Sequence, residues 1–447
     1  MKRRLFLAAA ASGAVAACAP GTVVEPTPTQ TSLAPVDRDL ADLGDVTLTV
    51  WDQEIRGGQN DQIQELNAQF EEAHPNVSIR RLSQSFDDLR KQTTLALSGN
   101  EVPDVVQVNN ARADMGAFVS AGQLLDLSSF AKTYGWAQRF PASVLSKMSY
   151  STDGVTFGEG NLYGLPQTGE IVGVYYRQDT LDRLGGKLPG TWDEYFQLLD
   201  AARGAGMQPM VLGNLDRWPA LHVFGPLQAA FVDADEVVKL GMGIVGSRWT
   251  SQGNLEALTK FAAWAAEGYL GDSPNGTDYD SAWRAFTEGN AAFLPAGSWL
   301  AADLEAAVGE GLRFMAPPVG ADGALATTGG TGIPWSIPAN AAHPEVAAAY
   351  LDFITTEKAM ETIAAHGVMP VLRAAELAPE AGVNRDVYEA FATVSEQGTL
   401  LPYLDYATPS FADTAGTVFQ ELIGGQKDPE AAAAALQADY AEFTRAG

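Results

Sequence analysis

Tryptophan, amide and acidic side chains stand at the ends of several extended segments, where they could contact a ligand. The stretch GNAAFLPAGSWL, residues 289–300, is a short apolar run that ends at Pro295 and Gly297 and then presents Ser298 and Trp299. An indole can cover the apolar C–H face of a pyranose, and charged or amide side chains can bind its hydroxyl rim. Trp299 has two interpretations: it packs inward at the start of a helix, or it holds its face out to a ligand. We favour the ligand, because Pro295 and Gly297 leave no bulk in front of the indole.

The signatures of catalysis and of metal or nucleotide binding are not supported by their sequence contexts. The run GMGIVG, residues 241–246, matches a dinucleotide-binding pattern, but a loop rather than a helix follows it. The histidines never approach the spacing of a metal pair, and no serine stands in a G-x-S-x-G turn. Paired carboxylates could serve glycoside cleavage, but the sequence alone does not place two of them together. These residues therefore give no support to an enzyme, and we predict no cofactor and no metal.

Residues 1–17 have the features of an export signal. Basic residues precede a short apolar run, and small residues lead to Cys18. The run is shorter than the roughly 20 residues that span a membrane. VAAC at 15–18 resembles a bacterial lipobox, in which the cysteine is lipidated, and RRLFL resembles a twin-arginine signal, so two export routes stay open. Cys18 is the only cysteine, so the mature fold has no internal disulfide.

The acidic composition excludes some partners. The chain has 28 Lys and Arg against 55 Asp and Glu, and loss of residues 1–17 removes three of the basic residues and lowers the net charge from −27 to about −30. Such a surface repels nucleic-acid phosphates and offers no basic face to a membrane. We predict an exported monomer held at the outer face of the cytoplasmic membrane only by the lipid on Cys18, with no nucleic-acid partner.

The folded part begins after a Pro- and Thr-rich stretch that reads as a flexible tether. VTLTVW at 46–51 alternates as a strand, and residues 60–75 have one apolar helical face with Asn60 as the cap. A strand, a helix over 86–97 and a strand at 104–108 follow. This β-α-β-α-β order predicts a parallel sheet with helices on both sides, and ligands sit beyond the carboxyl ends of the strands in such sheets.

The second half continues the α/β pattern. Residues 162–181 read as a strand that crosses between two lobes, and TTGGTGIPWSIP is a second extended segment. Thr191 and Glu194 have the spacing of a capping box. One helix is predicted over 344–367, and the last helix begins at Pro429. With 447 residues the chain exceeds one ordinary core, so two lobes are expected.

Taken in order, these segments resemble the bacterial extracellular solute-binding proteins of the maltose-binding type, which feed ABC importers. The matching segments are the lipobox, PDVVQVNNARADMGAFVSAGQLLDL, LYGLPQTGEIVGVYYRQDTLDRLGGKLPGTWDEY, FTEGNAAFLPAGSW and GGTGIPWSIP. The resemblance implies an α/β fold of the type II periplasmic-binding-protein kind, in which two lobes close on a ligand about a hinge. The implied division is a signal peptide at 1–17, a lipidated tether at 18–44, an N-terminal lobe at 45–168 plus 329–372, and a C-terminal lobe at 169–328 plus 373–447.

The resemblance also implies which residues contact the ligand, from the loops after the first and third strands, the crossing strand, and the Trp-containing segments. At the matching positions stand Trp51, Asp52, Gln53, Asn109, Asn110, Arg112, Gln167, Glu170, Asp216, Trp218, Gly297, Ser298, Trp299, Gly330, Thr331, Trp335, Tyr403 and Asp405. Packing is an open alternative for Trp51 and the favoured one for Trp335. For Glu170 the alternative is a solvated hinge carboxylate.

We therefore predict a lipoprotein that captures a di- or oligosaccharide and delivers it to the permease subunits of an ABC importer. A phosphorylated polyol such as a glycerol phosphate is an alternative ligand. It needs a cluster of basic residues, and Arg112, Arg217 and Arg373 are the near candidates. An exported glycosidase and a purely structural lipoprotein are alternatives from other classes.

Overall fold

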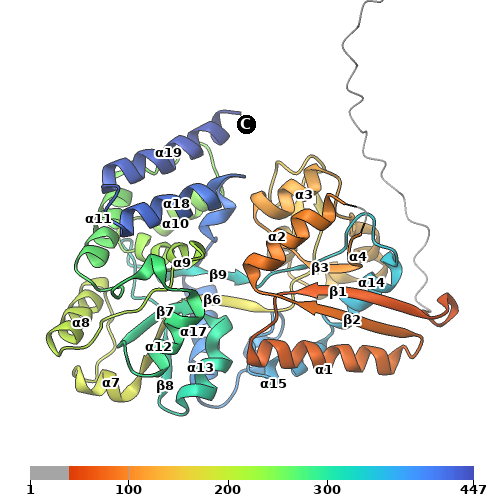
Figure 1. Ribbon diagram of the computed structural model, residues 1–447, viewed down its shortest axis with the longest axis horizontal. Helices are drawn as coiled ribbons and strands as arrows, with labels where there is room; N and C mark the ends of the chain where they lie inside the picture. Colours follow the sequence, from red (N-terminus) through yellow and green to blue (C-terminus); the bar gives the residue numbers. More distant parts are fainter. Residues whose placement is uncertain (1–39, 100, 447) are drawn as a thin grey trace, which may run out of the picture. The chain divides into compact units, whose positions relative to one another are not determined.

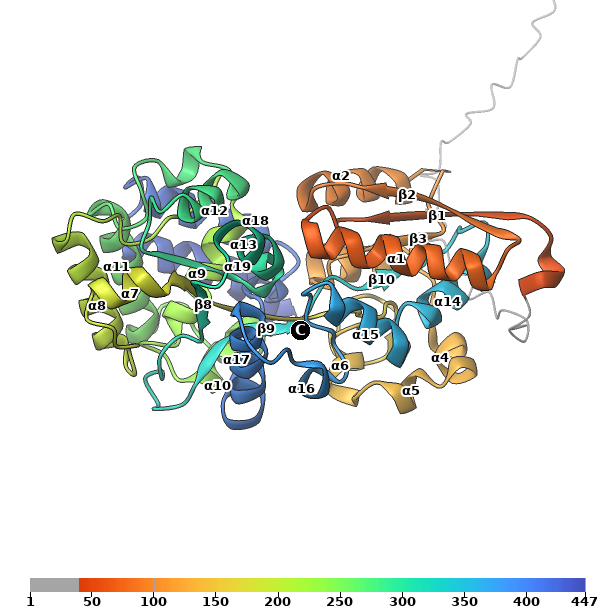
Figure 2. The same cartoon turned by 90° about the horizontal axis from the view of Figure 1, so that it is seen from below.

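Two mixed sheets flanked by helices make up the fold (Figures 1 and 2). The computed structural model describes residues 40–99 and 101–446. The predictions for the leader, for Cys18 and for the tether up to residue 39 fall outside these residues. Among the described helices, none is both long and apolar enough to cross a membrane.

The first sheet has the strand order β10-β3-β1-β2. β1 (Val46–Asp52), β2 (Val77–Ser83) and β3 (Val105–Gln107) are parallel, and β10 (Trp335–Ser336) pairs antiparallel with β3. α1 (Gly57–Ala73) and α2 (Phe86–Leu97) connect these parallel strands. The predicted β-α-β-α-β unit is therefore confirmed.

The predicted start of α1 was wrong. The helix begins at Gly57, and Asn60 lies inside it. The Asn60 side chain accepts a hydrogen bond from Arg81 NH1 at 2.9 Å, so it cannot act as the helix cap. The helix ends at Ala73, before Pro75, as predicted.

The second sheet is built around β6 (Gly169–Arg177). β7 (Phe293–Gly297), β8 (Leu312–Met315) and β9 (Ala326–Thr331) pair antiparallel with it, and β11 (Thr399–Leu401) lies parallel to β9. Nearly every residue of β6 is buried, which explains its long apolar run. β4 (Ser149–Tyr150) and β5 (Asn161–Leu162) form a separate hairpin.

Three neighbouring chain segments connect the elements around the two sheets: the stretch into β6, the stretch from β9 to β10, and the stretch between α15 and α17, where Pro370 bridges to Thr168. Leu165 bridges to Trp335, and β6 then pairs with β9 from Gly169 to Ile171. Figure 1 shows β6 and β9 extending from one group of elements toward the other. β1, β2, β3 and β10 fall within the predicted N-terminal lobe, and β9 runs across its predicted boundary at residue 329. The exact lobe bounds stay a prediction.

One predicted helix is two. α14 (Pro344–Phe353) and α15 (Glu357–Ala365) replace the single helix expected over 344–367. The Thr356 hydroxyl accepts the N–H of Ala359 at 3.2 Å and so caps a new helix. Pro344 lies in the first turn of α14, as predicted.

Capping and glycine signals elsewhere agree with the sequence. The hydroxyl of Thr191 accepts the N–H of Glu194 at 3.2 Å at the start of α8 (Trp192–Gly204). The Glu194 carboxylate accepts the N–H of Gly190 at 2.7 Å. GMGIVG follows α10 (Ala234–Gly241) rather than a strand, so it is not a dinucleotide-binding turn.

The other helices pack around the two sheets. They are α3 (Ala117–Ser120), α4 (Ser128–Tyr134), α5 (Trp136–Arg139), α6 (Ala142–Ser146), α7 (Gln178–Arg183), α9 (Trp218–Gln228), α11 (Gln252–Ala266), α12 (Tyr279–Thr287), α13 (Ala301–Val308), α16 (Ala374–Leu377), α17 (Val383–Gln397), α18 (Phe411–Ile423) and α19 (Pro429–Ala446). α19 begins at the predicted Pro429.

The chain enters the fold at the amino end of β1. Leu40 is buried, and the Asn76 side-chain amide donates to the carbonyls of Leu40 at 2.8 Å and Gly44 at 2.9 Å. The backbone N–H of Val46 donates to the Asn76 carbonyl at 2.8 Å. The first described residues are therefore fixed to the loop before β2.

Candidate ligand-binding site

A cavity of about 280 Å³ lies beyond the carboxyl ends of β1, β2 and β3. Its lining comes from the loops after these strands, from residues 216–222 and 278–280, and from residues 403–406. This is the edge at which open α/β sheets bind ligands, and the volume suits a small molecule.

Aromatic rings form one continuous side of the cavity, which we call the aromatic wall. Its members are Phe86, Trp218, His222, Tyr279, Trp299, Tyr403 and Tyr406, and all of them line the cavity. Neighbouring ring centroids lie 4.5 to 6.4 Å apart. Rings at this spacing offer an apolar surface of the kind that covers the C–H faces of a sugar.

Trp299 belongs to this wall, but the reason predicted from Gly297 was wrong. A Cβ atom built on Gly297 would lie 2.0 Å from the Trp299 ring, so the glycine accommodates the indole itself rather than clearing space for a ligand. The indole N–H donates to the Tyr279 hydroxyl at 2.8 Å. Ser298 does not line the cavity, because its hydroxyl accepts the backbone N–H of Ile171 at 3.1 Å.

Glu170 and Tyr403 form a polar pair in the cavity. The Tyr403 hydroxyl donates to Glu170 Oε2 at 3.0 Å. Burial raises the pKa of Glu170 to about 7, although the hydrogen bond from Tyr403 opposes the shift. Near neutral pH this carboxyl group therefore exchanges between an acceptor and a donor form.

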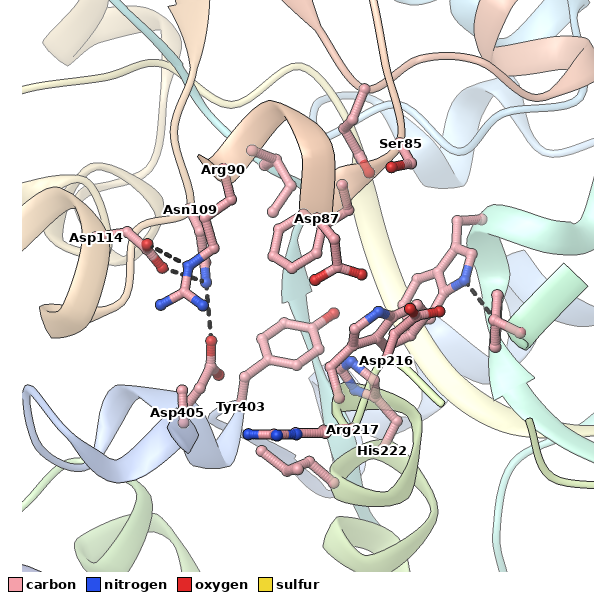
Figure 3. Close-up of a pocket in the computed structure, with 18 of the residues that line it drawn as sticks. Ser85, Asp87, Arg90, Asn109, Asp114, Asp216, Arg217, His222, Tyr403 and Asp405 are labelled. Carbon is pink, nitrogen blue, oxygen red and sulfur yellow. Dashed lines mark hydrogen bonds and ion pairs between the residues drawn. The ribbon is translucent and has the colours of Figure 1, made fainter. Parts of the chain in front are cut away.

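Figure 3 shows a hydrogen-bonded network of Arg90, Asn109, Asp114 and Asp405 in the site. Arg90 Nε donates to Asp114 Oδ1 at 2.5 Å, and the Asn109 amide donates to Asp114 at 3.3 Å and to Asp405 at 2.9 Å. Burial raises the pKa of Asp405 to about 6, and the bond from Asn109 opposes this. The network fixes amide and carboxylate groups at the cavity surface.

Two further contacts join residues from the two groups of elements. Arg56 NH2 donates to Asp280 Oδ1 at 3.0 Å. The Tyr406 hydroxyl donates to Asn110 Oδ1 at 2.8 Å, and the Asn110 amide donates to the carbonyl of Lys147 at 2.8 Å. Both sides of the cavity therefore contribute polar groups that are held in place.

Many of the residues predicted for the site line this cavity. They are Gln53, Asn109, Asn110, Glu170, Asp216, Trp218, Trp299, Thr331, Tyr403 and Asp405. Their role as ligand contacts stays a prediction, because lining the cavity does not itself show binding.

Asp52 and Trp51 lie behind the cavity rather than in it. Asp52 is fully buried and accepts hydrogen bonds from Arg81 Nε at 2.7 Å and from the Ser83 hydroxyl at 2.9 Å. Trp51 packs against the apolar cluster that contains Leu89. Both residues stabilise the end of β1. Trp51 therefore has the packing role that the sequence left open as an alternative.

Arg112, Gln167 and Trp335 also make contacts within the protein and do not line the cavity. The Arg112 guanidinium donates to the carbonyls of Tyr406 and Met242. The Gln167 amide donates to the Ile354 carbonyl at 3.2 Å. Trp335 is fully buried, so the favoured packing interpretation describes it correctly.

Gly330 is required by the backbone conformation and by the close approach of Lys147. It has a φ of +147°, and a Cβ atom there would lie 2.5 Å from Lys147 Nζ. Together with Gly297 and Ser298, it completes the set of predicted residues that do not line the cavity.

Sequence reasoning missed several lining residues, among them Phe86, Asp87, Arg90, His222 and Tyr279. Phe86, Asp87 and Arg90 lie in the first turns of α2, directly after a strand of the parallel sheet. The rule that ligands sit beyond carboxyl ends could have located these three. Tyr279 and His222 come from helices of the second group, and the sequence around them has no comparable signal.

Glu54 is buried, between the cavity-lining residues Gln53 and Ile55 in the sequence. Its burial is expected to make the stability of the fold depend on pH. Its Oε1 accepts the Gln107 amide at 2.6 Å, and Oε2 has no hydrogen-bond partner among the described residues. Burial raises the pKa of Glu54 to about 8. The folded protein therefore holds this proton more tightly than the unfolded chain, and the associated stability is lost as the pH rises toward 8.

We expect Glu54→Gln to flatten the fall in unfolding free energy between pH 5 and pH 8, because glutamine never ionises. Urea unfolding at several pH values measures this. Glu72→Gln, on the exposed side of α1, is the control and should keep the wild-type slope. Equal slopes in wild type and Glu54→Gln would contradict the prediction.

Comparison with known proteins identifies the chain. Residues 57–361 match the family described as bacterial extracellular solute-binding protein. The chain belongs to this family. Membership confirms the prediction of an exported solute-binding protein rather than an enzyme. In the part of the chain that the structure describes, no group of three or more His, Cys, Asp or Glu residues could hold a metal ion.

Individual relatives of this solute-binding protein are distant. A multiple sugar-binding protein of Streptococcus mutans serotype c is 26% identical over 300 residues, which are 65% of this chain and 67% of that protein. A lactose-binding protein of Rhizobium radiobacter is 24% identical over 168 residues, 35% of each chain.

Solved structures confirm the predicted fold of this solute-binding protein. A chitin oligosaccharide binding protein has a TM-score of 0.77 and 22% identity, covering 90% of this chain and 100% of that one. A solute-binding protein in complex with raffinose has a TM-score of 0.68 and 20% identity, covering 89% and 99%. At these identities the likeness shows the fold.

Proposed function

We propose that this solute-binding protein captures a di- or oligosaccharide in the cavity and delivers it to the permease of an ABC importer. The aromatic wall beside carboxylate and amide groups is the observation that supports this most strongly. Aromatic rings remove the apolar faces of a sugar from water, and the polar groups replace the water that bound its hydroxyls. A ligand without those hydroxyls would leave buried polar groups unpaired.

The printed names of similar proteins support the same ligand class. They include a multiple sugar-binding protein, a lactose-binding protein and a chitin oligosaccharide binding protein. These sugars differ in their units and linkages. The names therefore support carbohydrate as a class, and the sugar that fits this cavity depends on its own residues.

Closure about the connecting segments is the mechanism we propose. Residues from both groups of elements already meet across the cavity, as in the pairs Arg56–Asp280 and Asn109–Asp405. A sugar that contacts both sides binds the closed arrangement better than an open one. This difference in affinity drives the closure, and no covalent step is needed.

Anchoring and assembly complete the proposal. Cys18 would hold the mature chain to the membrane through its lipid, as a monomer, and the permease subunits would be its protein partners. The strongly acidic composition argues against a nucleic-acid partner.

The phosphorylated polyol fits the structure less well. Arg217 lines the cavity, but Arg112 is engaged by backbone carbonyls. Arg373 does not line the cavity, and it donates to Glu376 at 2.9 Å and Glu361 at 3.1 Å. The three candidate arginines therefore do not converge on one anion.

A thermal-shift screen tests the proposal. The chain from residue 19, which lacks the lipidation site, is heated with mono- and oligosaccharides, polyols and glycerol phosphates. A ligand present at 100 times its Kd adds about 2.7 kcal/mol of stability, so a sugar that binds will raise the Tm. A rise only with glycerol phosphates would overturn the sugar assignment. Turnover of a chromogenic glycoside would contradict a binding protein.

A further inference from the structure

The cavity has far more carboxylates than cationic groups. The acidic lining residues are Asp87, Asp114, Glu170, Asp216, Asp278, Asp280, Asp405 and Asp413, and the basic ones are Arg56, Arg90 and Arg217. Arg56 is paired with Asp280 at 3.0 Å and Arg90 with Asp114 at 2.5 Å. The lining therefore carries eight carboxyl groups against three guanidinium groups, two of which are already in salt bridges.

Asp87 and Asp216 are two lining carboxylates that form no salt bridge among the described residues. Asp87 lies in the first turn of α2, and Asp216 precedes α9, so they come from the two groups of elements. Figure 3 shows both carboxylates directed toward the same part of the cavity. Partial burial, and then the charge of Asp216, raise the pKa of Asp87, whereas Asp216 itself is exposed; the charge of Lys91 opposes the shift of the pKa of both carboxyls.

The remaining wall suits a cation as well. Burial lowers the pKa of His222 to about 4, so its imidazole is neutral and does not repel positive charge. Trp218 lies beside both His222 and Phe86, with ring centroids 5.3 and 6.4 Å away. Aromatic faces attract ammonium groups, most strongly where water is excluded.

Buried acceptors in the lining are also without donors. Gln59 and Thr331 line the cavity with exposed fractions of 4% and 5%. Gln59 Oε1 and Thr331 Oγ1 have no hydrogen-bond partner among the described residues. A bound ligand rich in N–H donors would satisfy such atoms, and an ammonium group supplies three donors and no acceptor.

We propose that the ligand is a carbohydrate that carries a protonated amine, an amino sugar, with the amine held between Asp87 and Asp216. This inference rests on the proposed function, and it names the chemical class of the sugar. The amine pairs with two carboxylates that otherwise repel each other, and the sugar ring lies against the aromatic wall. A neutral hydroxyl or acetamide in its place leaves that repulsion uncompensated.

Calorimetric titration of matched sugars tests the inference. The chain from residue 19 is titrated with glucosamine, galactosamine and chitosan oligosaccharides, and with their hydroxyl and N-acetyl counterparts. Oligosaccharides of uronic acids are the anionic arm, because the Arg217 guanidinium lines the cavity. We expect an amine to bind about ten- to a hundredfold more tightly than its neutral counterpart, as charge-assisted bonds do, and to weaken with salt.

Variants separate the two carboxylates from general charge effects. Asp87→Asn and Asp216→Asn should each remove most of the preference for the amine while leaving the unfolding transition in place. Asp235→Asn is the control, because Asp235 is an exposed first-turn residue of α10 that does not line the cavity. It should keep the wild-type preference.

The outcomes divide cleanly. An amine preference that is lost in Asp87→Asn and Asp216→Asn supports the inference. Neutral or uronic sugars that bind as tightly as amines overturn it and leave the proposed function standing. A preference unchanged in both variants overturns the assigned position. Failure of every sugar to bind contradicts the proposed function, and the inference with it.

Discussion

Trp299→Ala will weaken carbohydrate binding by about 1.5–3 kcal/mol, roughly ten- to 150-fold in Kd. The indole is part of the aromatic wall, and it is oriented by a 2.8 Å hydrogen bond to Tyr279 and by the space at Gly297. Alanine removes both the apolar surface and the ring that fills this space. Calorimetric titration with the sugar that gives the largest thermal shift measures the loss.

Trp299→Phe separates contact from folding. Phenylalanine keeps an aromatic face but lacks the N–H that Tyr279 accepts, so part of the affinity should return. Urea unfolding of both variants shows how much of the effect comes from lost stability. Affinity equal to wild type in Trp299→Ala would remove Trp299 from the ligand site.

Asp52→Ala will destabilise the fold by about 3–5 kcal/mol, the usual cost of removing one partner of a buried ion pair. The Asp52 carboxylate is fully buried and bonds Arg81 twice, at 2.7 and 2.8 Å. Without it the Arg81 guanidinium, whose side chain is only 13% exposed, stays in the interior with unmet donors. Urea unfolding followed by fluorescence measures the change.

An exposed pair provides the matched control. Arg203 and Glu267 lie 3.1 Å apart with side chains 51% and 55% exposed. Glu267→Ala should lower the free energy of unfolding far less than Asp52→Ala, because water replaces the lost partner. If the two variants were equally stable, Asp52 would not hold the end of β1 in the way its contacts indicate.

Local signals in the sequence were sufficient for the first sheet. Alternating apolar residues, capping residues and Pro75 located β1, α1 and α2 to within a few residues. Thr191 capped its helix as predicted, because its hydroxyl needs only the N–H of Glu194 three positions on. Such contacts depend on neighbours in the chain, and the chain order is visible in the sequence.

The site was only partly predictable, because distant contacts decide which polar groups face the cavity. Asp52 and Gln53 are adjacent in sequence. Arg81 from β2 forms a salt bridge with Asp52, whereas Gln53 lines the cavity. Ser298 and Trp299 divide in the same way, since Ile171 of β6 engages the serine hydroxyl. No local pattern distinguishes the members of these pairs. Gly297 shows the same limit, because its role depends on where the Trp299 ring folds back.

β1 runs from the first described residues toward the cavity. The strand begins beside the Leu40–Asn76 contact, where the chain arrives from its proposed lipid anchor, and it ends beside the cavity. Its seven residues span roughly 20 Å at about 3.3 Å per residue. The length of β1 therefore separates the first described residues from the cavity. With the proposed anchor at Cys18, a longer or shorter tether should change how far the protein reaches from the membrane, while the sugar that it binds stays the same.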